Sequence, residues 1–204
     1  MLALGGPDPA PTDSPPAELI ADTLLRTPWI GSCIAAHEDR PGIFDIKSAS
    51  DIALVNLFVR RSEFSGFDES VGYIGEDTRL IAELMRRGRV VYHGGVRVSH
   101  RRRAFPGPYL RQRWRYRVKT GEMLRRRDNV YTANFKVRLF FAAAFVSIVT
   151  LPFSIPIYYL LTFILGARAT RLPARYWPML PFAFFAHHAT YLGGIIVGWL
   201  RGRR

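Results

Sequence analysis

The chain has 204 residues, of which 49% are hydrophobic, and its 29 Lys and Arg residues against 16 Asp and Glu residues give a formal net charge of +13. This length suits one domain of ordinary size or a small domain joined to a second unit, and the single cysteine excludes an internal disulfide and fits a reducing compartment. The charge alone would allow nucleic-acid binding. However, the arginines lie beside apolar runs and no recognition motif is present, so no nucleic-acid partner is expected.

The N-terminal third predicts few regular elements. Residues 1–16 are rich in Pro, Gly and Asp, which predicts a loop, and they lack the basic and apolar regions of a signal peptide. The segment AELIADTLLR at 17–26 predicts a helix, because its apolar residues fall near one face. Residues 29–45 contain glycine and proline breakers and predict irregular structure, whereas IALVNLFV at 52–59 predicts a buried strand with an unusual polar insertion, Asn56.

The central part of the chain predicts a loop, a helix and two short strands. The loop covers 64–75, and the helix covers 77–87, where apolar residues repeat at helical spacing before a terminating glycine. The strands are expected at 90–92 and 96–99. A basic helix with several aromatic residues follows at 109–127, and its composition predicts that it lies along a membrane surface.

Two apolar runs in the C-terminal part contain no Asp, Glu, Lys or Arg, at 139–167 and 176–200. A helix of about 20 apolar residues can cross a bilayer, so the sequence predicts a water-facing part over 1–132 and a membrane region over 133–204. Two prolines in the first run predict one kinked span or a re-entrant hairpin. The basic residues at 86–138 favour the cytoplasmic side and contact with anionic membrane lipids.

The second apolar run carries further features of a packed membrane helix. Gly194 and Gly198 have the four-residue spacing that allows two helices to approach closely. The adjacent His187 and His188 are polar residues within an apolar run, and we interpret them as packing and hydrogen-bonding residues before considering them as metal ligands.

The adjacent carboxylates Glu76 and Asp77 stand directly behind a glycine at the start of the predicted helix. Carboxylates are common there because they accept bonds from backbone N–H groups and interact favourably with the helix dipole. A carboxylate in this place can also act as a general base that takes a proton from an attacking hydroxyl group. The pair by itself leaves both interpretations open.

An ordered series of segments surrounds this pair: NLFVRRSEF, GFDE, GEDTRL, a helix that ends in RRG, and VVYHGGVRVSH. The series resembles the acceptor-side half of the GT-A fold of family 2 glycosyltransferases, over roughly 56–121. The C-terminal AHHATYLGGIIVGWLRG resembles the last span of membrane-attached members of the succinoglycan-synthesis type. The resemblance implies an α/β fold, with a partial GT-A (Rossmann-like) domain followed by a C-terminal α-helical transmembrane region.

The resemblance also implies roles for individual residues. Asp77 would be the catalytic base, and Glu76 would orient the site or touch the acceptor. Asp68 and Glu69 would lie in the loop that borders the acceptor pocket. The other candidates for acceptor or donor binding are Asn56, Arg60, Arg61, Gln112, Arg113 and Trp114.

Two of these assignments have alternatives. The resemblance places a histidine such as His100 near a metal–diphosphate group, although a lone histidine is more often structural. The segment Gln112–Trp114 resembles the Gln-x-x-Arg-Trp element of membrane-bound members but lacks its two intervening residues. From Gln112 through Tyr116 to Gly121 the segment looks more like the Gln…Tyr-Gly…Gly stretch of non-processive members. The alternative without a catalytic role is a basic helix facing solvent or lipid.

The function that the resemblance implies is inverting transfer of a sugar from a nucleotide-sugar donor to a lipid-linked or cell-envelope polysaccharide acceptor. It would take place at the cytoplasmic face of a bacterial plasma membrane, in a multi-pass protein with Mg²⁺ or Mn²⁺ as cofactor. The Asp-x-Asp motif expected to bind that metal is absent from the chain. A nucleotide-binding half would therefore be expected ahead of Met1.

Three explanations of that missing half stay open: a truncated gene model, a partner chain that supplies it, or a decayed remnant. The alternative function is a non-catalytic remnant or a membrane-anchored accessory subunit that binds a partner or anionic lipid.

Overall fold

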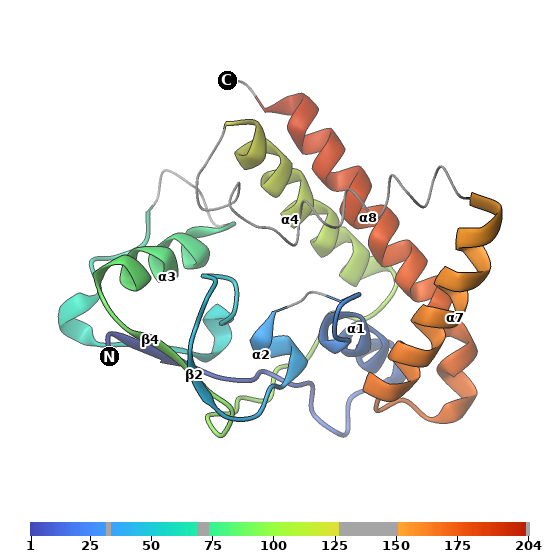
Figure 1. Cartoon of the computed structure of the whole chain (residues 1–204), viewed down its shortest axis with the longest axis horizontal. Helices are drawn as coiled ribbons and strands as arrows, with labels where there is room; N and C mark the ends of the chain where they lie inside the picture. The colour runs from blue at the N-terminus through green and yellow to red at the C-terminus, as the bar shows by residue number, and fades with distance from the viewer. Residues whose placement is uncertain (32–33, 69–73, 127–150, 203–204) are drawn as a thin grey trace.

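The computed structural model describes residues 1–31, 34–68, 74–126 and 151–202. The protein is mixed α/β, with a small four-stranded sheet and mostly helices. Figure 1 shows the sheet and helix α3 at one end of the molecule and the other long helices at the opposite end.

The sheet has the strand order β2-β4-β1-β3, formed by β1 (Ala3–Gly5), β2 (Ile43–Asp45), β3 (Leu57–Val59) and β4 (Val90–His93). The two central strands, β1 and β4, run parallel, and each edge strand is antiparallel to its neighbour. Leu4 lies opposite Phe58 on one side and Val91 on the other.

Several strand predictions were wrong. Residues 1–16 are not all loop, because Ala3–Gly5 pairs with two strands that come later in the chain. Of the strand expected at 52–59 only β3 forms, after a 3₁₀ turn, η1 (Leu54–Asn56). The segment 29–45 contains the short helix α2 (Ala35–Glu38) and β2, and residues 96–99 form no strand.

Helix α3 (Glu76–Arg87) confirms the prediction for 77–87 and begins one residue earlier. Its buried residues Leu80, Ile81 and Leu84 join the hydrophobic core of the sheet. Burial of these residues sets which face of the helix packs against the sheet. The first turn of the helix lies toward the middle of the molecule in Figure 1.

The other half of the molecule is a helical layer built from α1 (Pro16–Arg26), α4 (Gly107–Arg125), α7 (Leu151–Ala169) and α8 (Leu180–Arg201), with the 3₁₀ segment η4 (Ala174–Met179) between the last two. The α1 and α4 predictions are confirmed to within two residues at either end. The buried face of α1 packs in one core with residues of α4 and α8. This core contains Leu19, Ile20, Leu24, Tyr109, Leu180 and Phe184.

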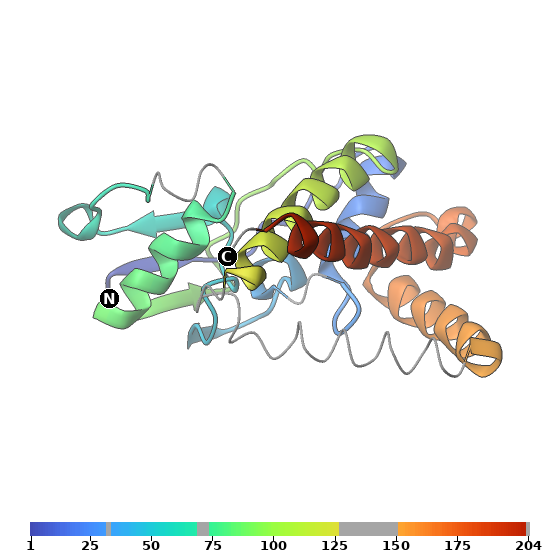
Figure 2. The same ribbon diagram turned by 90° about the horizontal axis from the view of Figure 1, so that it is seen from above.

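Helices α4 and α8 lie side by side and run in the same direction, as Figures 1 and 2 show. Glycines make the close approach possible, because a Cβ atom at Gly198 would lie 1.9 Å from the backbone oxygen of Val118. A Cβ atom at Gly121 of α4 would lie 2.2 Å from the backbone oxygen of Ile195. The glycine spacing in the second apolar run thus serves close packing as predicted, and its partner is the basic helix α4.

Among the described residues one helix, Ala174–Arg201, is long and apolar enough to cross a membrane, which is consistent with membrane attachment. Residues 139–150 of the first apolar run lie outside the described residues, and Ser154–Ala169 is shorter than a span. The multi-pass prediction is therefore not supported by the part of the chain that the structure describes.

Candidate functional site

The first turn of α3 carries the adjacent carboxylates Glu76 and Asp77, both half-buried. Gly75 precedes the helix with φ of 94°, a left-handed conformation that would be strained for a residue with a side chain. Since Gly75 has no side chain to cap the helix, the bond at this end comes from Asp77, whose Oδ1 accepts the N–H of Thr78 at 2.7 Å. Both interpretations of the pair are compatible with this geometry, because Asp77 bonds at the helix terminus and stays partly accessible.

A shallow cleft of roughly 330 Å³ lies one turn further along α3, at the side of Leu80. Its walls are mainly apolar and come from η1, β3, the following loop and α3. They consist of Leu54, Leu57, Val59, Arg61, Phe64, Phe67 and Leu80. Phe64 and Phe67 meet edge to face with ring centroids 5.5 Å apart, and both rings are partly exposed. A cleft of this kind suits a ligand with an apolar face or chain.

Two charged groups belong to the segments that form the cleft. Asp68, next to Phe67 in the loop, accepts a 2.8 Å ion pair from Arg79, two residues after Asp77. Arg61 contributes the one cation among the described lining residues. Asp68 thus bonds to α3 and Arg61 lines the cleft, whereas Glu76 and Asp77 lie one helical turn from Leu80 and are not lining residues.

Asn56 is 1% exposed and joins three segments of chain. Its side-chain nitrogen donates to the backbone oxygens of Pro7 at 3.0 Å and Val96 at 2.7 Å. Arg60 follows β3 and is exposed, while its backbone N–H extends the sheet by donating to Leu2. Glu69 lies outside the described residues.

The candidates Gln112, Arg113 and Trp114 lie on α4, in the helical layer. The Arg113 guanidinium lies over the rings of Tyr116 and Tyr109, 5.0 Å and 5.7 Å from their centroids. Burial lowers the pKa of Arg113, although the group is still cationic at neutral pH. Trp114 packs against α8 at Gly193.

A buried ionic cluster connects the two halves of the protein, and the exposed His100 lies at its edge. Asp8 is fully buried, and its carboxylate lies 2.7 Å from His37 Nδ1, 3.4 Å from His100 Nδ1 and 2.9 Å from Arg102 Nη1. Arg102 also donates from Nε to Asp22 of α1 at 3.0 Å. Burial by itself would raise the pKa of Asp8, but the bonds from the two histidines and the arginine hold it well below its usual value.

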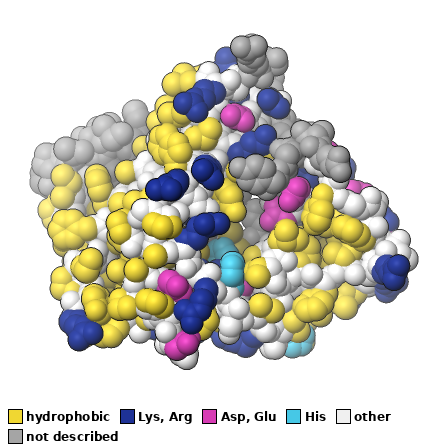
Figure 3. All heavy atoms as spheres, turned by 180° about the vertical axis from the view of Figure 1, so that it is seen from behind, with side chains coloured by type: hydrophobic (Ala, Val, Ile, Leu, Met, Phe, Trp, Pro, Cys, Tyr) yellow, Lys and Arg dark blue, Asp and Glu magenta, His cyan; other side chains and the backbone are white. Residues whose placement is uncertain are grey.

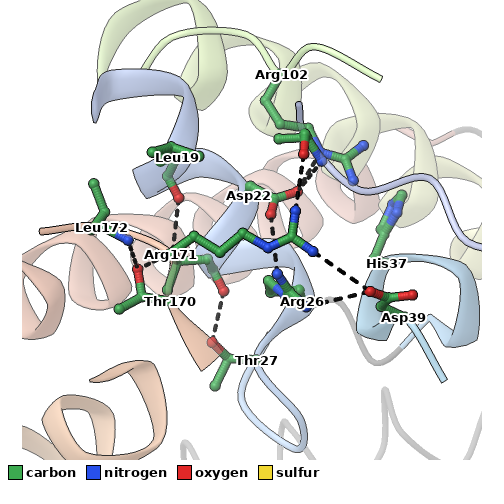
Figure 4. A network of polar contacts seen from close by, with 12 residues as sticks. Leu19, Asp22, Arg26, Thr27, His37, Asp39, Arg102, Thr170, Arg171 and Leu172 are labelled. Carbon is green, nitrogen blue, oxygen red and sulfur yellow. Dashed lines mark hydrogen bonds and ion pairs between the residues drawn. The ribbon is translucent and has the colours of Figure 1, made fainter. Parts of the chain in front are cut away.

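Figure 4 shows how this cluster continues toward the C-terminal helices. Asp22 pairs with Arg26, which lies near Asp39, and Asp39 also meets Arg171 beyond α7 at 3.7 Å. Segments that are more than 130 residues apart along the chain are therefore joined by alternating charges. Each buried carboxylate has a cation beside it, which is the condition for keeping charges inside a protein.

The surroundings of His100 do not suit a divalent cation. Asp8 is the nearest acidic ligand, and both of its oxygens are already engaged by the Arg102 guanidinium, which would repel a metal ion. Within the described ranges no group of three or more His, Cys, Asp or Glu residues is placed to hold a metal. The Mg²⁺ or Mn²⁺ that the resemblance implies stays a prediction.

Reasoning from the sequence missed the cluster of Asp8, Asp22, His37 and Arg102. One signal was present: at about 100° per residue, Asp22 lies between the apolar Leu19 and Leu25 around the predicted helix. A carboxylate on a buried face requires a buried cation as partner. Nothing local in the sequence showed that Arg102, eighty residues later, supplies it.

No family model, curated protein or solved structure matches this chain.

Proposed function

We propose that this chain carries the acceptor-side part of a membrane-attached inverting glycosyltransferase. The proposal rests above all on one observation: the half-buried Glu76–Asp77 pair at the start of α3 lies one helical turn from an apolar cleft. The order of elements around the pair, an antiparallel β3, then α3, then β4 parallel to β1, accords with the resemblance of the segments that form them.

Asp77 is the proposed general base. Its Oδ1 is held by the Thr78 N–H and hydroxyl, which orients the carboxylate so that Oδ2 can take the proton of an acceptor hydroxyl. The hydroxyl oxygen then forms a bond to C1 of the donor sugar as the bond from C1 to the diphosphate oxygen breaks, with inversion at C1. The leaving nucleoside diphosphate carries away the electron pair, and its stabilisation falls to groups that hold the donor.

The cleft is the proposed acceptor site. Phe64 and Phe67 offer apolar surfaces to a sugar ring or to the lipid of a lipid-linked acceptor, and Arg61 could pair with an acceptor phosphate. Glu76 would orient the site or touch the acceptor, and Asp68 would border the acceptor pocket, while the role of Glu69 stays a prediction outside the described residues. Acceptor- or donor-binding roles stay predictions for Asn56, Arg60, Gln112, Arg113 and Trp114.

The test is sugar transfer in membranes that contain the full chain together with the components of its native membrane. Membranes are supplied with nucleotide sugars, and both nucleoside diphosphate release and label in the lipid extract are measured. Asp77→Asn should lower turnover by about a hundredfold or more, the usual range for a general base. Glu83→Gln, a carboxylate on the same helix but away from its first turn, is the matched control and should keep full turnover.

Turnover that survives Asp77→Asn would remove Asp77 as base. If no nucleotide sugar is consumed under any condition, a non-catalytic accessory role is favoured. The absence of Asp-x-Asp from the chain already points in that direction.

A further inference from the structure

One side of α8 exposes large apolar residues along its whole length. Phe182, Phe185 and Leu200 are 65%, 66% and 69% exposed, and Ile196 lies between them along the helix. At 100° per residue these positions fall within one narrow sector of the helix. Figure 3 shows hydrophobic side chains gathered over the end of the molecule that α7 and α8 form. Water-facing monomers rarely expose so continuous an apolar surface.

The neighbouring helix α7 extends the same apolar surface. Tyr159 of α7 and Phe182 of α8 are both exposed, and their rings meet edge to face with centroids 5.2 Å apart. Ile155, Ile157 and Leu160 are further exposed side chains on α7. The exposed sides of the two helices are therefore continuous.

The opposite side of α8 is occupied by the basic helix α4. Tyr109 bonds to His187 at 2.9 Å at one end, and Gly198 contacts Val118 near the other. Arginines of α4 lie along the seam: the Arg117 guanidinium is 3.9 Å from the centroid of the Tyr191 ring and that of Arg125 is 4.2 Å from the Trp199 ring. Arginine stacked on Tyr and Trp beside an apolar face is the arrangement expected at a lipid headgroup boundary.

This contact decides between two orientations of α8. If α8 crossed a bilayer with α4 still packed along it, Arg113, Arg117 and Arg125 would enter the hydrocarbon region. An arginine at the bilayer centre is disfavoured by roughly a hundredfold, so placing this row of arginines in the hydrocarbon region would be strongly unfavourable. If α8 lies in the plane of the membrane surface, its apolar side enters the bilayer and α4 stays at headgroup level.

We propose that α8, with α7 beside it, lies in the plane of a bilayer that contains anionic lipid. The sector of Phe182, Phe185, Ile196 and Leu200 is buried among acyl chains. The basic α4 covers the opposite side, where the exposed Arg111 and Arg115 attract anionic headgroups. The proposal does not depend on glycosyl transfer, because its tests require no turnover.

Label depth distinguishes the two orientations. The full chain with Cys33→Ser receives a fluorescent label at Phe185→Cys, Ala189→Cys or Leu200→Cys, all exposed positions of one α8 sector. The outer positions are roughly 22 Å apart along the helix. In vesicles of phosphatidylcholine and phosphatidylglycerol, lipid-attached quenchers should place all three labels at one shallow depth. A reductant added outside should bleach all three equally.

A spanning helix gives a different pattern: a middle label near the bilayer centre and one end label protected from the outside reductant. That pattern would overturn the proposal. A second result would also overturn it: labels that are shielded from the reductant without vesicles, in a chain that light scattering shows to be a dimer. A second copy of the chain would then cover the apolar surface.

Charge reversal tests the lipid requirement. Arg111→Glu together with Arg115→Glu should weaken partitioning onto the anionic vesicles by about tenfold or more. The matched control is Arg86→Glu, an exposed arginine of α3 near the sheet, which should leave partitioning within about twofold. Equal binding to vesicles of phosphatidylcholine alone would overturn the anionic-lipid part of the proposal.

Discussion

Removing the buried Arg102 guanidinium should strongly lower the free energy of unfolding, because this group neutralises two buried carboxylates at once. Its guanidinium bonds to both oxygens of Asp8, at 2.9 Å and 3.2 Å, and to Asp22 at 3.0 Å. The change Arg102→Met keeps most of the side-chain volume and removes the charge. Asp8 and Asp22 would then have to stay charged without this partner or take up protons.

The magnitude follows from the burial of the partners. Both carboxylates are 2% exposed or less, and removing one member of a buried ion pair costs about 3–5 kcal/mol, since it leaves an uncompensated charge. His37 and Arg26 still contact the two carboxylates, so we expect a loss of about 4 kcal/mol. That is a large part of the roughly 5–15 kcal/mol of a typical folded domain.

The assay is urea unfolding of the detergent-solubilised chain, followed by the fluorescence of its four tryptophans. Arg101→Met is the matched control, because the neighbouring Arg101 is about half exposed and pairs with Asp13 and Glu18 at the surface. It should cost less than about 1 kcal/mol. Adding Asp8→Asn to Arg102→Met should recover part of the loss, since one of the two orphaned charges is then gone.

The reasoning fails if Arg102→Met unfolds within about 1 kcal/mol of the unmodified chain while the Arg101→Met control behaves as expected. The two carboxylates would then have to be hydrated or otherwise neutralised, and the buried cluster would not join the two halves of the protein as described.

Three further predictions follow from the packing, the buried titrating groups and the cleft. Gly198→Leu should lower the free energy of unfolding by about 1–3 kcal/mol or more and separate α4 from α8, because its Cβ would clash with the backbone of Val118. The control is Gly107→Ala, whose Cβ would have nothing within 4 Å and which should leave the melting temperature nearly unchanged. Acid should destabilise the protein in two stages. Burial lowers the pKa of His37 below 6.5. As the pH falls through 6.5, the unfolded chain therefore binds a proton at His37 before the folded chain does, and the free energy of unfolding decreases. The depressed pKa of Asp8 contributes stability that is present above pH 3.8, the ordinary pKa of the group, and is lost as the pH falls toward the pKa in the folded chain. Asp8→Asn should remove this second stage in urea titrations at stepped pH. The same loss of stability at low pH in the variant would contradict this prediction. Finally, Phe64→Ala should raise the KM for a lipid-linked acceptor about tenfold and leave the KM for the nucleotide sugar unchanged, as expected for a lost aromatic contact. The control is Phe58→Ala, at an exposed residue outside the cleft lining, which should leave both KM values unchanged.

Helices could be predicted well from the sequence, because their signals are local. The segments at 17–26, 77–87 and 109–127 carry apolar residues at helical spacing and clear stop residues, and α1, α3 and α4 form there. The position of Glu76 and Asp77 at a helix start could be predicted for the same reason.

Strands were predicted less well, because a three-residue strand is decided by its neighbours. Ala3–Gly5 has little strand character of its own in a segment rich in Pro and Gly, yet it becomes a central strand because β3 and β4 lie on either side of it. Residues 96–99 have suitable composition but find no pairing strand.

From the amino-acid sequence one can predict the longer helices, the basic and apolar character of the C-terminal part, and the carboxylate pair at a helix start, since each depends on residues within a few positions of one another. The folded chain adds the contacts of Arg102 with Asp8 and Asp22, the apolar cleft beside α3, and the packing of α8 against a basic helix. These features depend on contacts between segments tens of residues apart. Such contacts are selected by burial and charge pairing in the folded chain, and no local pattern of residues encodes them.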